Sequence, residues 1–187
     1  MKKNVLAALL VLVFCVQAQA AGHSIVFYRI GESGQEAWTL LKDYFEAKGY
    51  SVAVIQGETA IEKHVEKVNR INRGGRGSVF LALELVPDER RHVMVAESDA
   101  RMGEGRFLAI DEIPARFAGE SDRLAASVAA PFSAHVKHLP LYPLLGVNMP
   151  GIVVKLEFDQ GETLNTIAKV YRGVDNYFSE RTKRDEK

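Results

Sequence analysis

The clearest structural signal in the chain is Val79-Phe80-Leu81-Ala82-Leu83, a run in which every side chain is apolar. A strand with one face in water alternates apolar and polar side chains, whereas an unbroken apolar run is typical of a parallel strand covered on both faces. The glycine-rich stretch 74–77 lies directly before this run and is a turn signal. The run therefore predicts a central strand of a parallel sheet with helices on both sides.

The segments on either side of this run alternate between strand and helix patterns. Apolar residues recur every three or four positions in the predicted helices, as at Ala37, Leu40 and Leu41. Such alternation predicts one α/β domain over residues 21–179, a three-layer sandwich whose mainly parallel, roughly six-stranded sheet is flanked by helices. The predicted strands are 24–28, 52–55, 79–83, 92–95 and 152–156, and the predicted helices are 37–45, 59–73, 121–135 and 164–178.

The first twenty residues have the pattern of a cleaved secretory signal peptide. Lys2 and Lys3 precede an apolar run over 5–16, and Ala18-Gln19-Ala20 supplies the small residues typical of a cleavage site. The run is too short to cross a bilayer, which needs about 20 apolar residues. We therefore expect a signal peptide over 1–20, a periplasmic or secreted protein, and no transmembrane anchor after cleavage.

The composition of the remaining chain argues against several classes of function. Removal of residues 1–20 takes away the only cysteine, Cys15, and two of the 24 basic residues, while all 24 acidic residues stay. Proteins that bind nucleic acid carry a basic excess or stripe, so no nucleic-acid partner is expected. The residues 180–187 mix both charges, which predicts a solvated, frayed tail.

The chain lacks the common sequence motifs of metal sites and serine nucleophiles. There is no His-Glu-x-x-His motif and no Gly-x-Ser-x-Gly motif. His135 and His138 are three residues apart, but Pro140 follows closely, which argues against a helical ligand pair. For the histidines as a group, surface or capping roles are expected rather than metal binding.

Three stretches of the chain are informative in their order and spacing. They are LKDYFEAKGYSV at 41–52, EKVNRINR at 66–73, and LYPLL at 141–145 followed by MPGIVVKLEF at 149–158. They resemble segments of the zinc-dependent N-acetylmuramoyl-L-alanine amidases, which cut the bond between muramic acid and L-alanine in peptidoglycan. Ser121-Asp122-Arg123-Leu124-Ala125 also resembles the start of one of the helices of that family. The resemblance implies the fold of that family over most of residues 24–178, with peptidoglycan as ligand and zinc as the family's cofactor.

The positions that carry chemistry in this family are changed here. The turn that bears its first zinc-ligating histidine reads Tyr28-Arg29-Ile30-Gly31-Glu32, without a histidine. The third ligand, also a histidine, corresponds to Leu83, and the catalytic glutamate corresponds to Lys155. The second ligand, a glutamate, corresponds to Glu32 or Glu36, and the shortened segment leaves both open.

These changes predict an amidase-like pseudoenzyme with no catalytic residues, no metal ligands and no zinc. Zinc activates water by lowering its pKa, and a single carboxylate cannot hold the ion once both imidazoles are gone. Lys155 either replaces the lost cation by pairing with Glu32, Glu36 or Glu84, or extends its ammonium to the rim of a cleft. The residues expected around the vestigial cleft are Arg29, Glu32, Glu36, Leu83, Glu84, Lys155 and Glu157.

The residues leave three functions open. The first is a pseudoenzyme that binds peptidoglycan fragments or an envelope protein and modulates cell-wall turnover. The second is an active amidase or other hydrolase with a relocated site, and the third is a purely structural protein that binds an envelope partner. The relocated site would use Glu32, Glu84, Glu157 and either His92 or His138.

Overall fold

The computed structural model describes residues 22–32, 34–75, 77–105 and 107–186. The predicted signal peptide at 1–20 lies outside these residues. None of the helices in the described part of the chain combines the length and the apolar character needed to cross a membrane.

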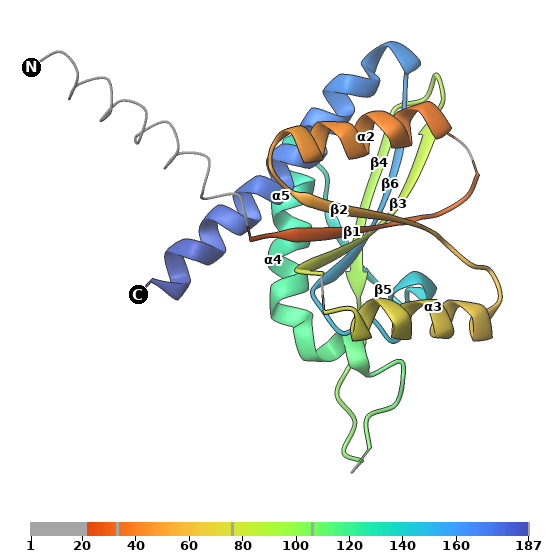
Figure 1. Ribbon diagram of the computed structural model, residues 1–187, viewed down its shortest axis with the longest axis vertical. Helices are drawn as coiled ribbons and strands as arrows, with labels where there is room; N and C mark the ends of the chain where they lie inside the picture. Colours follow the sequence, from red (N-terminus) through yellow and green to blue (C-terminus); the bar gives the residue numbers. More distant parts are fainter. Residues whose placement is uncertain (1–21, 33, 76, 106, 187) are drawn as a thin grey trace, which may run out of the picture.

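Six strands form a single sheet in the order β2-β1-β3-β6-β4-β5 (Figure 1). The four strands from β2 to β6 are parallel, β4 is antiparallel to β6, and β5 is parallel to β4. This arrangement confirms the predicted mainly parallel, six-stranded α/β sheet. The strands are β1 (Ser24–Arg29), β2 (Ser51–Gln56), β3 (Val79–Pro87), β4 (His92–Ser98), β5 (Val136–Leu139) and β6 (Gly151–Phe158).

Helices cover both faces of this sheet and complete the three layers (Figure 1). The first face packs against α2, α4 and α5 in the larger hydrophobic core, and the second face packs against α3 and the segment 141–149. The four helices are α2 (Gln35–Ala47), α3 (Ile61–Arg73), α4 (Ala118–Ala129) and α5 (Thr163–Asp185). Short 3₁₀ turns lie at Ile113–Phe117, Ala130–Phe132, Tyr142–Leu144 and Gln160–Glu162.

The apolar run in β3 explains why this strand lies inside the sheet. Successive side chains of a strand point to opposite faces. Leu81 and Leu83 are buried in the core of the first face, while Phe80 and Ala82 are buried in the core of the second. Because each face of β3 is covered, no position in the first part of the strand requires a polar side chain.

Two expectations for the regular structure need correction. The helix predicted to reach residue 135 ends at Ala129, a 3₁₀ turn containing Pro131 follows, and strand β5 begins at Val136. Proline lacks the amide hydrogen that a helix interior needs, so the chain leaves the helix here. The charged segment 180–187 was expected to be frayed, but α5 continues through it as far as Asp185.

Candidate functional site

The second face of the sheet carries polar side chains beyond the part that α3 covers. Parallel α/β sheets bind their ligands outside the carboxyl ends of the strands, so a ligand site is expected at this end of the face. Ala82 on β3 and Val153 on β6 are buried against α3 and the segment 141–149. Two residues further along each strand, the same face carries Glu84 and Lys155, which are half-buried.

Glu84, Lys155 and Glu157 form an ion cluster, termed here the Lys155 cluster. The register of β3 and β6 places Glu84 directly beside Lys155, and Glu157 follows two residues later on the same face. The ammonium of Lys155 lies 3.2 Å from the carboxylate of Glu157 and 3.6 Å from that of Glu84. The hydrogen bond that Lys155 donates to Glu157 and the charge of Glu84 raise the pKa of Lys155 above its ordinary value. Lys155 is thus a fixed cation held between two carboxylates.

The pairing of Lys155 with Glu84 agrees with one of the partners expected from the sequence. Leu83, by contrast, is completely buried in the core of the first face and does not line a cleft. The neighbouring Glu84 points to the opposite side because side chains alternate along a strand.

Arg29, the last residue of β1, contacts α2 and holds the loop between β1 and α2. Its guanidinium donates hydrogen bonds of 2.5 Å to the Gln35 side chain and to the Glu32 carbonyl. It also lies 5.8 Å from the centre of the Trp38 ring, which is a cation–π distance. Glu32 and Glu36 are exposed at this loop and contribute no ion pair to the Lys155 cluster.

A pocket of about 560 Å³ opens where β1 and β2 end. Ile30 forms part of its wall, and the main-chain amide of Ile30 donates a 2.8 Å hydrogen bond to the Leu83 carbonyl, immediately before Glu84. The pocket therefore lies beside the strand that carries Glu84. Its lining consists of Tyr28, Arg29, Ile30, Gly31, Glu32, Gln56, Gly57, Glu58, Thr59, Tyr142 and Pro143.

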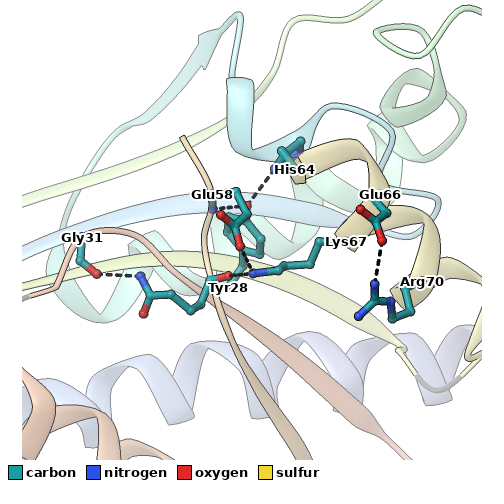
Figure 2. Close-up of polar contacts among 8 residues, drawn as sticks. Tyr28, Gly31, Glu58, His64, Glu66, Lys67 and Arg70 are labelled. Atoms are coloured by element: carbon teal, nitrogen blue, oxygen red, sulfur yellow. Dashed lines mark hydrogen bonds and ion pairs between the residues drawn. The ribbon is translucent and has the colours of Figure 1, made fainter. Parts of the chain in front are cut away.

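The pocket residue Tyr28 forms a buried hydrogen bond with His64 (Figure 2). The Nε2 of His64 lies 3.2 Å from the Leu145 carbonyl, which can only accept, so Nε2 carries the proton and Nδ1 is the acceptor. The Tyr28 hydroxyl donates to Nδ1 at 2.7 Å and accepts the Glu58 main-chain amide at 2.8 Å. Burial lowers the pKa of the fully buried His64, which favours its neutral form.

His64 therefore has a structural role that the sequence did not indicate, since the histidines were expected at the surface or at helix ends. Its partners lie 36 and 81 residues away in the chain. The apolar spacing of α3, which places position 64 close to Val68 on the helix, is the only sequence signal for its burial.

Charged side chains fix the rim of the pocket (Figure 2). The ammonium of Lys67 pairs with the carboxylate of Glu58 and donates a 2.7 Å hydrogen bond to the Gln56 carbonyl. The Gln56 side chain in turn donates to the Gly31 carbonyl at 3.0 Å. The hydrogen bond from Lys67 lowers the pKa of Glu58, so the rim carries an ionised pair near neutral pH.

The residues expected for a relocated metal site do not assemble around one point. His138 pairs with Glu97 at 2.7 Å at the β5 edge of the sheet, whereas Glu84 and Glu157 share Lys155. His92 lies opposite Glu157 in the register of β4 and β6, and Glu32 is exposed in the loop after β1. Among the described residues, no three histidine, cysteine, aspartate or glutamate side chains lie close enough together to hold a metal ion. The side chains at this end of the sheet therefore do not fit zinc.

No protein-family model matches the chain, and no curated protein matches it in sequence. Solved structures with a similar fold include an amidase and an endolysin domain. The N-acetylmuramyl-L-alanine amidase Ami1 from Mycobacterium smegmatis superposes with a TM-score of 0.61 at 11% identity, over 86% of this chain and 99% of that one. The chain has an amidase-like fold. The catalytic domain of the CD27L endolysin targeting Clostridia Difficile gives a TM-score of 0.56 at 14% identity, over 82% and 97% of the two chains.

Proposed function

We propose that this amidase-like protein is an exported pseudoenzyme that binds peptidoglycan fragments and modulates cell-wall turnover without hydrolysing its ligand. The observation that carries the proposal is the Lys155 cluster. Lys155 stands where the resembling amidases have their catalytic glutamate, and it pairs with Glu84 and Glu157.

The chemistry of Lys155 opposes hydrolysis at this position. A general base must accept a proton from the attacking water, and an ammonium has no lone pair with which to do so. The neighbouring carboxylates raise the pKa of Lys155, which makes the neutral, basic form still rarer. With the ligand positions also changed, the strand ends retain a binding surface and lose the means to activate water.

The pocket beside this cluster supports a binding role. Its lining includes the exposed side chains of Gln56 and Thr59 and the carboxylate of Glu58, which together supply both donors and acceptors. Glycan and peptide groups are recognised through such hydrogen bonds within concave sites. The internal ion pair of Glu58 with Lys67 keeps this rim close to neutral, so the pocket presents polarity with little net charge.

The test uses purified protein recovered from expressing cells, with its N-terminus read by mass spectrometry to locate any signal cleavage. Metal content, peptide release from purified sacculi and co-sedimentation with the same sacculi are measured on one preparation. We expect retention on sacculi without stoichiometric zinc and without released peptide. Zinc together with peptide release would identify an active hydrolase, and a failure to co-sediment would refute the ligand assignment.

Matched variants connect binding to the pocket. Thr59 is exposed and lines the pocket, whereas Thr39 is exposed on α2 and does not line it. Thr59→Trp fills the pocket entrance and should weaken co-sedimentation, while Thr39→Trp adds the same bulk elsewhere and should leave it unchanged. If both variants co-sediment with sacculi to the same extent, the sacculi do not bind at this pocket.

A further inference from the structure

The strand β2 forms an open edge of the sheet that lacks the usual protection. Its six residues Ser51-Val52-Ala53-Val54-Ile55-Gln56 contain no charged residue and no proline, and four of them are exposed. Natural edge strands are normally kept from pairing with other chains by charges, prolines, bulges or short length. The opposite edge follows this rule, because β5 has only four residues and exposes Lys137 and His138.

The hydrogen bonds of β2 show which main-chain groups are available at this edge. The amides of Ser51 and Gly57 donate to the β1 side, to the carbonyls of His23 and Arg29. In a parallel strand the amide and carbonyl of one residue point the same way and successive residues alternate, so Val52, Val54 and Gln56 point outward. The Gln56 carbonyl accepts the Lys67 ammonium, which agrees with this direction. Among the described residues, no side chain or loop bonds the outward groups of Val52 and Val54.

We propose that β2 pairs antiparallel with β2 of a second copy of this chain, about a twofold axis at Ala53, and joins the two sheets into one. In that register Val52 of one copy lies opposite Val54 of the other, and each such pair exchanges amide and carbonyl hydrogen bonds in both directions. Every free outward group of Val52 and Val54 gains a partner. The Gln56 carbonyl is not needed for this pairing, and it already accepts a hydrogen bond from the Lys67 ammonium.

The composition of β2 suits an identical partner in particular. A twofold interface places the same patch of surface against itself, so any charge within the strand would bring a like charge close to it. β2 has none. Small Ala53 faces its own copy at the axis, where a non-hydrogen-bonded pair has Cα atoms only about 4.5 Å apart.

Cysteine cross-linking tests the register directly. The only natural cysteine, Cys15, lies in the predicted signal peptide, so single cysteines can be introduced into the recovered protein without competition if that segment is cleaved. Ala53→Cys should form a disulfide-linked dimer under mild oxidation, because Cα separations of about 4.4–6.8 Å suit a disulfide. Ser51→Cys points to the same face, but its two copies would be about 13 Å apart along the strands, so it should not cross-link.

Sedimentation equilibrium measures the association itself. The wild-type protein should approach twice its monomer mass, and Val54→Pro should remain a monomer, since proline removes an outward amide that β1 does not use. Val54→Lys gives a second disruption without a backbone constraint, and Val54→Thr is the control that should still associate. Circular dichroism verifies that each variant is folded. A monomeric wild type, a dimeric Val54→Lys, or equal cross-linking at positions 51 and 53 would overturn the proposal.

Discussion

Replacing Tyr28 by phenylalanine isolates the contribution of the buried hydroxyl beneath the pocket. The change removes the donor to His64 Nδ1 and the acceptor of the Glu58 amide, while the ring and its packing stay. His64 is fully buried, so its Nδ1 is left without a donor and without access to water. A buried polar atom without a partner costs about 1–3 kcal/mol. The Glu58 amide borders the pocket, where water can replace the hydroxyl at little cost.

We therefore expect Tyr28→Phe to lower the free energy of unfolding by about 2 kcal/mol. For a chain of this size that corresponds to a fall in Tm of roughly 4–8 °C. Urea unfolding followed by the fluorescence of Trp38, the single and buried tryptophan, measures the change. Tyr44→Phe is the control, because the Tyr44 hydroxyl makes no hydrogen bond to any described residue, and it should cost less than about 0.5 kcal/mol. Equal stability of the Tyr28→Phe variant and the wild type would refute the assigned hydrogen-bond chain.

Three further changes address the same histidine, the helix packing and the Lys155 cluster. Burial lowers the pKa of His64 from its ordinary 6.5, so below pH 6.5 the unfolded chain binds a proton that the folded chain does not. The free energy of unfolding should therefore fall as the pH drops below 6.5. Urea titrations of His64→Gln should lose this part of the pH dependence. Gly173→Ala places a Cβ 2.6 Å from the Cα of Val128 where α5 crosses α4, and thermal unfolding should show a loss of about 1–3 kcal/mol or more. Lys155→Met leaves the carboxylates of Glu84 and Glu157 together without a cation between them. NMR titration should show a raised pKa of Glu84, while the free energy of unfolding changes by less than about 1 kcal/mol.

Each of these changes has a contrasting result that would contradict its reasoning. If the free energy of unfolding of His64→Gln depends on pH as that of the wild type does, a group other than His64 causes the dependence. Gly119→Ala is the packing control, because its nearest neighbour would be the Arg123 side chain at 3.9 Å and alanine favours a helix more than glycine does. A loss of stability as large as that of Gly173→Ala would contradict the packing explanation. An unchanged pKa of Glu84 in Lys155→Met would show that the ammonium does not govern this carboxylate.

The sequence predicts those parts of the molecule that follow from local periodicity. The apolar run of β3 indicated a covered parallel strand, and the structure places it in the interior of the sheet. Leu83 and Glu84 show where this reasoning ends, because an error of one residue in a strand moves a side chain to the other face. The burial of His64 depends on contacts with Tyr28 and Leu145, which are distant in sequence, and periodicity carries no information about such pairs.

Strand register also explains why a lysine suits position 155. In parallel pairing the residue beside Glu84 is fixed, and the next residue on that face of β6 is Glu157. A glutamate at position 155 would place three carboxylates together, and like charges at this distance raise one another's pKa unless a cation lies among them. A bound metal ion can supply that cation in an amidase, whereas the side chains described here do not fit one. The ammonium of Lys155 supplies positive charge from within the strand, and it lies between the carboxylates of Glu84 and Glu157.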